Sequence, residues 1–294
     1  MQTVVTHDGS FHPDDVLAIA SIKLFLNDEP VEIIRTRDKE RIIAADWAVD
    51  VGEEYDPERR RFDHHQNGLP PRENDIPYAA FGLVWKSYGE AICGSADVAA
   101  QIEAQLVQPI DAGDNSISLY TLNELQVAPY ELFSVISAFR PVWGSEHQND
   151  DAFADAVDFA EELLARIIAH AQASKTVREV AEAGYRAAED KSLLVFDDPV
   201  DRHMFIQYPD VHMVVYPADM TKQKWKASTV PTGEIAFESR AHLPAEWSGL
   251  RDGELASVSG IPDAIFCHKE RFLFVAGSQE SAVQAAKIAL GKAE

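Results

Sequence analysis

Short apolar segments alternate with amphipathic ones through the first 65 residues, and this alternation constrains the fold more than any other feature. Residues 3–6, 32–36, 47–51 and 61–64 have the character of short strands. Residues 14–26 and 39–45 are predicted helices, and Pro13 stands at the start of the first, where a missing N–H costs nothing. Strand–helix alternation with short connections predicts a parallel, doubly wound sheet, which places ligands at the carboxyl ends of its strands.

The pattern changes further along the chain. Residues 79–138 are predicted to be mostly helical, and residues 151–190 carry one long helical pattern. Strands are predicted at 193–196, 212–215, 225–229, 265–267 and 272–275, before a closing helix at 278–290. We therefore expect an α/β protein in three parts. These are a doubly wound, mostly parallel domain in 1–150, bridging helices in 151–190 and a smaller α+β domain in 191–294.

Acidic residues dominate the charge, with 49 Asp and Glu against 26 Lys and Arg and a net charge of −23. Such a charge argues against tight binding of nucleic acid through a broad basic face. Residues 201–294 are nearly balanced, with 10 basic and 12 acidic residues, so an anionic ligand is expected to meet this part.

Other features of the sequence bear on the compartment. Cys93 and Cys267 are too few for a disulfide framework, and the N-terminus lacks the basic and apolar regions of a secretory signal. No apolar run approaches the roughly 20 residues of a membrane span. We expect a cytoplasmic protein with no membrane partner.

Asp and His residues gather in four clusters. The first three follow predicted strands, and the fourth lies in a predicted loop between helices. Residues of this kind at adjacent strand ends can converge in one crevice, where imidazole nitrogen and carboxylate oxygen suit Mn²⁺, Zn²⁺ or Mg²⁺. A shared carboxylate such as Asp50 can bridge two ions roughly 3.5–4 Å apart. The clusters span residues 7–15, 49–52, 62–66 and 111–115.

Each cluster alone also has an ordinary explanation. A His–His pair such as His64-His65 is commonly structural, and Asp–Gly–Asp loops are commonly turns. Asp14-Asp15 can simply cap a helix and complement its dipole. Taken together, the four clusters favour a metal site.

These motifs resemble the DHH phosphoesterase superfamily and, more closely, the melanocyte-proliferating-gene family of DHH-like proteins. The resemblance covers essentially the whole chain. The segments that carry it are Thr6–His12, Arg35–Asp38, Asp50–Pro57, Phe62–Gln66, Asp111–Asn115, Trp247–Asp252 and Ser259–Pro262.

The resemblance implies a two-domain, metal-dependent phosphodiesterase with 3′–5′ exonuclease-like action on RNA or short oligonucleotides. It implies two ions per chain, Mn²⁺ with Zn²⁺ or Mg²⁺ as alternatives. One would be held by His7, His12 and Asp50, the other by Asp14, Asp50, His64 and Asp111.

The resemblance also implies roles for the neighbouring residues. Asp63 would fix a histidine tautomer, and His65 would face the scissile phosphate, although either His64 or His65 can be the ligand. His65 or Asp114 could give a proton to the leaving oxygen.

The C-terminal part offers candidates for gripping the substrate, a short RNA or a small phosphodiester. They are Lys224 with Lys222, Trp225 and Lys226 beside it, and Arg251, His268 and Arg271. The lysines can equally protect an edge strand, and His268 can be an ordinary strand residue.

One departure from the DHH pattern widens the choice of function. Gly277 alone follows His268, where DHH proteins have a Gly-Gly turn. A pyrophosphatase-like hydrolase and a non-catalytic, metal-bound interaction protein are therefore the alternatives. A homo-oligomer is compatible with all three.

Overall fold

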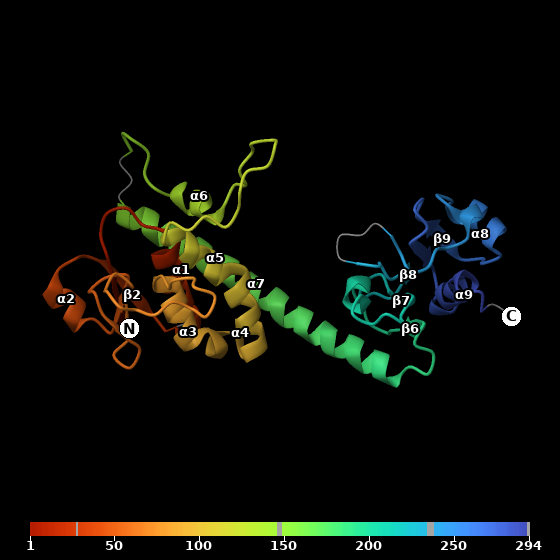
Figure 1. The fold of residues 1–294 in the computed structure, drawn as a ribbon, viewed down its shortest axis with the longest axis horizontal. Helices are drawn as coiled ribbons and strands as arrows, with labels where there is room; N and C mark the ends of the chain where they lie inside the picture. Colours follow the sequence, from red (N-terminus) through yellow and green to blue (C-terminus); the bar gives the residue numbers. More distant parts are fainter. Residues whose placement is uncertain (28, 146–148, 234–237, 293–294) are drawn as a thin grey trace. The chain divides into compact units, whose positions relative to one another are not determined.

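A computed structural model describes residues 1–27, 29–145, 149–233 and 238–292 of the chain (Figure 1). The chain divides into two compact units, residues 1–173 and 174–294, and each is described by itself. The two units contain separate sheets, which confirms an α/β protein with two sheets.

The sheet of the first unit has the strand order β2-β1-β3-β5-β4. The first four of these strands pair in parallel, and β4, which the sequence analysis missed, is an antiparallel edge strand on β5. A mostly parallel sheet is thus confirmed. Its strands are β1 (Gln2–Thr6), β2 (Val31–Arg35), β3 (Trp47–Val49), β4 (Tyr55–Asp56) and β5 (Arg61–Phe62).

Helices cover both faces of this sheet, as a doubly wound fold requires. α1 (Pro13–Leu26) and α3 (Ala80–Cys93) pack in the large core on one face. α2 (Lys39–Ala44) packs in a smaller core on the other face, where Ile42 meets Val5 and Ala48. Figure 1 shows α2 apart from α1 and α3. The chain leaves β1 toward β2 and later returns to β3 on its other side, so the carboxyl ends of β1 and β3 form the switch point of the sheet.

The helical region after α3 differs from the prediction in two places. Helical structure is continuous through α4 (Ala96–Ile102), the π-helical turn Glu103–Val107 and α5 (Gln108–Asp114). Asp111 therefore lies in a helix, and the predicted loop at this position is wrong. Gly113 suggested a turn, but its missing side chain makes room for Phe133, whose ring would lie 2.5 Å from a Cβ there. Phe133 belongs to α6 (Leu132–Ser137), which contacts α5.

The second difference is the segment between α5 and α6. Residues 117–131 contain no helix or strand, so the prediction of helix is wrong there. Their large apolar side chains are exposed rather than packed, with Leu125 78% and Tyr130 76% exposed. Without a face to bury, a helical segment gains little from tertiary packing.

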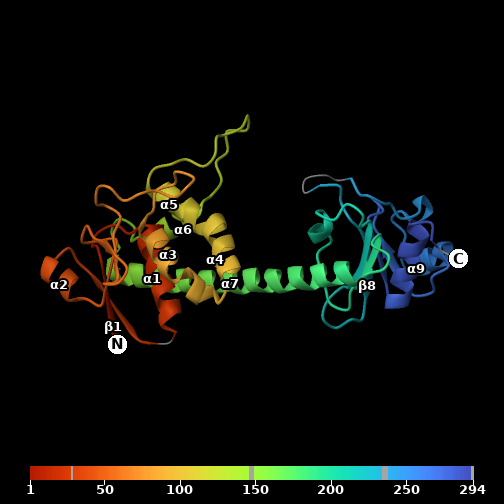
Figure 2. The ribbon, with the colours of Figure 1, turned by 60° about the horizontal axis from the view of Figure 1, so that its bottom comes forward.

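The long predicted helix is confirmed as α7 (Asn149–Ala187). Its first half contributes Phe153, Val157 and Leu164 to the core of the first unit (Figure 2). Its last part contributes Ala181 to a core of the second unit. Within the ranges that the structure describes, no helix is both long enough and apolar enough to cross a membrane.

The second unit is a mixed sheet with helices, in agreement with the α+β prediction. The strand order is β6-β7-β8-β10-β9, and only β6 and β7 pair in parallel. The strands are β6 (Leu193–Val195), β7 (Met213–Pro217), β8 (Trp225–Thr229), β9 (Ala264–Cys267) and β10 (Leu273–Ala276). α8 (Asp252–Ser259) was not predicted, whereas the closing helix is confirmed as α9 (Gln279–Ala289). α9 buries Ala282, Ala285 and Ala286 in a core with Phe274 of the sheet.

Candidate metal centre

Three parallel strands deliver side chains to one edge of the first sheet. His7 is the first residue after β1, Asp50 the first after β3, and Asp63-His64-His65 follow β5 directly. Because these strands are parallel, their carboxyl ends lie at the same edge, which is the switch point described above.

The start of α1 supplies the second part of the group. Pro13 takes the first helical position, and His12 is the residue that caps the helix. The backbone N–H of His12 donates to Asp15 Oδ1 at 2.9 Å, so one oxygen of Asp15 caps the helix. The other oxygen, Oδ2, lies 3.2 Å from His7 Nε2. The capping explanation and the site explanation for this carboxylate therefore both hold.

Asp50 lies between two histidines. Its Oδ2 is 3.2 Å from His7 Nε2, and its Oδ1 is 3.2 Å from His64 Nε2. The residue is 3% exposed and has φ of +55°, a left-handed conformation that costs a non-glycine residue about 1–3 kcal/mol. The surrounding structure thus holds Asp50 in an unfavourable conformation that presents one oxygen to each histidine.

Asp14 is a fully buried carboxylate that lacks ordinary partners. It is 0% exposed, and neither of its oxygens has a hydrogen-bond partner among the described residues. His64 Nε2 lies 3.9 Å from Asp14 Oδ2, too far for a hydrogen bond. Burial, together with the charges of Asp50 and Asp114, raises the pKa of Asp14 well above its usual value. A cation beside this group would remove the cost of burying the carboxylate.

Protons compensate part of this charge when no cation is bound. Burial alone would lower the pKa of His7, but its contacts with Asp15 and Asp50 outweigh burial and raise the pKa to about 10. Burial likewise opposes ionisation of Asp50, yet His64 and His7 lower its pKa to about 2. The Nδ1–H of His7 donates to the carbonyl oxygen of Asp8 at 2.8 Å, which aims Nε2 at the carboxylates.

Asp63 orients His65 in a similar way. Its Oδ1 lies 2.7 Å from His65 Nδ1, and its other oxygen accepts the backbone N–H of Glu53. Burial opposes ionisation of Asp63, but His65 and the N–H donors lower its pKa overall. The contact with Asp63 in turn raises the pKa of His65. Since Nδ1 donates to Asp63, Nε2 of the half-exposed His65 ring is left to face a ligand.

The fourth motif contributes a different carboxylate from the one that the family resemblance implied. Asp114 Oδ2 lies 3.4 Å from His64 Nε2, and Oδ1 lies 3.7 Å from His12 Nδ1. Asp111 instead accepts from Arg72 Nη2 at 2.7 Å and from the N–H of Gly82 at 3.0 Å. The structure therefore brings Asp114 to the histidines and holds Asp111 in a separate buried ion pair.

The donor atoms form three groups suited to metal ions. Within each group, the donor atoms lie within 4.8 Å of one another. Two atoms that bind one ion at about 2.1 Å each are at most about 4.2 Å apart, so small movements would close each group around an ion. The groups are His7 with Asp15 and Asp50, His64 with His65 and Asp50, and His12 with Asp14 and Asp114.

Asp50 belongs to two of these groups, which makes it a candidate for a bridging carboxylate. A cavity of about 690 Å³ opens onto the site, and His7, His12, Asp50, His64 and Asp114 are among its lining residues. We call this cavity and its lining residues the metal centre. Its nitrogen and oxygen donors, together with the unpartnered Asp14 carboxylate, fit divalent cations.

Comparison with known proteins agrees with this site. The model of the MYG1_exonuc family, described as an uncharacterised protein family (UPF0160), matches residues 3–290. The chain belongs to this MYG1 family. The human MYG1 exonuclease is 30% identical over 321 residues, which cover 98% of this chain and 85% of the relative. The MYG1 protein C27H6.8 of Caenorhabditis elegans is 30% identical over 320 residues, which cover 97% and 94% of the two chains.

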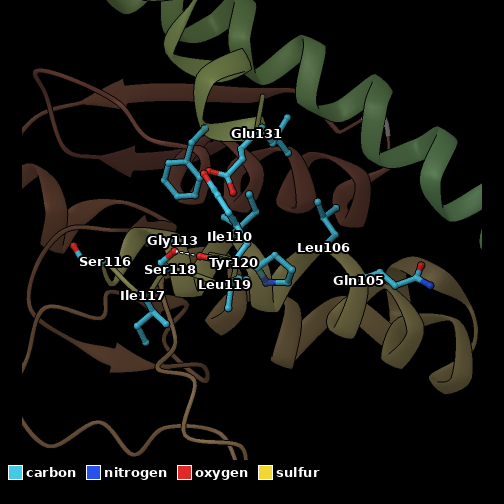
Figure 3. A pocket seen from close by; sticks show the side chains of 13 residues that line it. Gln105, Leu106, Ile110, Gly113, Ser116, Ile117, Ser118, Leu119, Tyr120 and Glu131 are labelled. Atoms are coloured by element: carbon cyan, nitrogen blue, oxygen red, sulfur yellow. Dashed lines mark hydrogen bonds between the residues drawn. The ribbon is translucent and has the colours of Figure 1, made fainter. Parts of the chain in front are cut away.

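A second cavity beside α5 lacks the chemistry of the metal centre in this MYG1-family chain. It measures about 520 Å³, and Leu106, Ile110 and Phe133 give it an apolar lining. Glu131 is the one carboxylate among its described lining residues (Figure 3). The Asp and His residues of the metal centre do not line it, so we do not assign the family's chemistry to this cavity.

Arg251 and His268, expected to contact substrate, lie in a continuous stack in the second unit. Arg202 lies over the ring of Phe272 (4.3 Å), whose centroid is 4.3 Å from that of His268. Phe266 lies 6.1 Å from His268, and Arg251 covers Phe266 at 4.4 Å. We call these five residues the cation–aromatic stack.

The strand register places part of this stack on the face of the second sheet that α9 does not cover. Phe266 pairs with Val275, which in turn pairs with Lys226. Residues directly opposite in antiparallel strands share a face, whereas Phe274, the neighbour of Val275, belongs to the core with α9. Lys226 also lies 5.7 Å from the ring of Tyr216, so a cation accompanies the aromatic side chains on this face.

The other expected substrate contacts lie in turns. Lys224 is exposed directly before β8, and Lys222 lies 3.4 Å from Asp198. Trp225 is buried at 8% exposure, so it is not a free stacking platform. Arg271 occupies the turn between β9 and β10 with φ of +58°, and its N–H donates to the carbonyl oxygen of His268. Arg271 and Lys224 are outside the cation–aromatic stack.

Several residues of the site were absent from the sequence-based assignment. Asp15 was visible in the sequence next to Asp14, but the choice between a cap and a ligand needed the position of His7. Arg72, Phe266 and Phe272 gave no local signal, because their partners are distant in the sequence.

Proposed function

We propose that this chain is a metal-dependent phosphodiesterase that removes nucleotides from the 3′ end of RNA or short oligonucleotides. The observation that carries the proposal is Asp50, which presents one oxygen to His7 and the other to His64 at 3.2 Å each. A carboxylate so placed suits a pair of cations, the arrangement that serves phosphoryl transfer. The name of the human relative, MYG1 exonuclease, supports the same reaction class.

The ligand sets follow from the three donor groups, with Mn²⁺ as the proposed ion. His7, Asp15 and Asp50 would hold one ion. The second ion would lie with Asp50, His64 and Asp114, where the unpartnered carboxylate of Asp14 also points. This assignment replaces Asp111 by Asp114 and adds Asp15 to the set.

The chain's own residues would then act on the bound phosphodiester. When bound, two divalent cations neutralise charge on the phosphate oxygens and acidify a water molecule. The imidazole of His65, fixed by Asp63 at 2.7 Å, presents Nε2 toward the cavity and can give a proton to the leaving oxygen. The contact with Asp63 keeps His65 protonated to higher pH, as a proton donor requires.

The cation–aromatic stack would bind the rest of the substrate strand. Bases stack on aromatic faces such as Phe272 and His268, and arginines add charge for the phosphates. Such a surface recognises single strands with little sequence preference. It also provides local positive charge in a chain of net charge −23, which lacks a broad basic face.

Hydrolysis of a short 5′-labelled RNA in the presence of Mn²⁺ tests the proposal. The wild-type chain is expected to shorten the RNA from the 3′ end, and Asp50→Asn to lower the rate by about a hundredfold or more. Asp97→Asn, an exposed carboxylate in α4, is the control and should leave the rate unchanged. Mn²⁺-loaded wild-type protein that releases orthophosphate from pyrophosphate but leaves RNA intact would contradict the proposal.

A further inference from the structure

A third cavity adjoins the metal centre on the side of α2. It measures about 450 Å³, within the range of small-molecule sites. Arg37, Asp50 and His65 line both this cavity and the metal centre, so the two are continuous. We call it the α2 cavity. A group attached to a phosphate at the metal centre can therefore extend into it.

The lining of the α2 cavity differs from that of the metal centre. Ile42 and Ile43 of α2 and Val51 give it an apolar side, and Ile43 is 69% exposed. Gly52 keeps the space beside Ile42 open, because a Cβ at this position would lie 3.1 Å from Ile42 Cγ2. A flat apolar group can pack against this side.

Two cations stand at the same cavity. Arg37 and Lys39 both line it, although the first 200 residues carry 37 acidic and only 16 basic residues. Arg37 pairs with Asp8 at 3.1 Å, and both side chains are more than half exposed, so this pair is weak enough to yield to a stronger anion. Glu53 also lines the cavity and offers a carboxylate that can accept from sugar hydroxyl groups.

An anion joined to a flat apolar group through a hydroxyl-bearing unit matches these three features. We infer that the α2 cavity binds the nucleoside of the nucleotide whose phosphate lies at the metal centre, with the base against Ile42 and Ile43. The inference rests on the proposed function, since that function places the phosphate at the metal centre. It makes the substrate class nucleotidic, because inorganic pyrophosphate would leave the α2 cavity unused.

Calorimetric titration of the Mn²⁺-loaded chain with AMP and with ribose 5-phosphate tests the inference without requiring turnover. The two probes share phosphate and sugar and differ only in the base. Wild-type protein should bind AMP about tenfold or more tightly than ribose 5-phosphate. Ile43→Glu should abolish this difference and leave the affinity for ribose 5-phosphate unchanged. Val180→Glu, an exposed valine of α7, is the matched control and should keep the difference.

Two results would overturn the inference. One is equal affinity of wild-type protein for AMP and ribose 5-phosphate, including no binding of either. The other is wild-type preference for AMP in Ile43→Glu. Hydrolysis of bis(p-nitrophenyl) phosphate, which contains no nucleoside, is measured in parallel. Hydrolysis without a preference for AMP would retain the proposed function and reject the α2 cavity, whereas preference for AMP without any hydrolysis would do the reverse.

Discussion

Asp111 and Arg72 form a buried ion pair in which Oδ2 lies 2.7 Å from Nη2. Asp111 is 0% exposed, and burial raises its pKa to about 7 even though Arg72 opposes the shift. Arg72 also contacts Glu103 of the π-helical turn that precedes α5. The pair therefore fixes α5, the helix that carries Asp114 to the metal centre.

Removal of Arg72 tests this structural role. Arg72→Leu leaves the Asp111 carboxylate buried without its cation, and we expect a loss of about 3–5 kcal/mol in the free energy of unfolding, measured with urea. Arg59→Leu, which breaks the exposed pair with Glu54, should cost about 1 kcal/mol or less. Equal effects of the two substitutions would contradict the role assigned to Arg72.

Close packing around the same carboxylate gives a second prediction. A Cβ at Gly82 would lie 1.7 Å from Asp111 Oδ2 and 2.5 Å from Arg72 Nη2. Gly82→Ala should therefore displace the pair and destabilise the chain by about 1–3 kcal/mol, seen as a lower Tm. Gly253→Ala in α8 meets nothing within 4 Å and should be neutral or stabilising by up to about 1 kcal/mol. A Gly82→Ala protein as stable as wild type would show that the pair is not held this tightly.

The unpartnered carboxylate of Asp14 gives a prediction whose sign depends on metal. Without metal, Asp14→Asn removes a buried charge and should leave the protein as stable as wild type, or up to about 2 kcal/mol more stable. With Mn²⁺, wild type should gain more stability than the variant, because ligands that bind only the folded state stabilise it. Thermal unfolding with EDTA and with Mn²⁺ measures both. Equal stabilisation of the two proteins by Mn²⁺ would exclude Asp14 from the site.

The cation–aromatic stack gives a prediction about substrate binding. Phe272→Leu keeps an apolar side chain but removes the ring between Arg202 and His268. We expect the affinity for a short single-stranded RNA to fall about tenfold, with hydrolysis of bis(p-nitrophenyl) phosphate unchanged. Tyr130→Leu, an exposed aromatic residue of the first unit, is the control for fluorescence-anisotropy titrations. An unchanged RNA affinity in Phe272→Leu would remove the stack from the substrate surface.

The sequence predicts most of the sheet and the edge at which the site forms, because both depend on local patterns. Apolar segments and their connections locate the strands, and parallel pairing places His7, Asp50 and His64 together. The choice between Asp111 and Asp114 is different. The two residues are one helical turn apart, about 4.5 Å along the axis, so their partners depend on packing between distant elements.

The residues that the sequence analysis missed have a common reason. Gly113 in a helix is explained by Phe133, and the stack joins Arg202 to Phe272, which is 70 residues later in the printed sequence. Local propensity contains no information about such contacts, which tertiary packing decides.

The metal content of the purified chain tests the central claim most directly. Protein purified without chelator and incubated with Mn²⁺ is measured by mass spectrometry, for wild type and for Asp50→Asn. Asn tolerates the left-handed conformation that Asp50 adopts at φ of +55°, so the substitution tests the charge rather than the backbone. The account predicts about two ions per wild-type chain and loss of both in the variant, since Asp50 is shared. A wild-type chain that binds no Mn²⁺, or an Asp50→Asn chain that retains two ions, would contradict it.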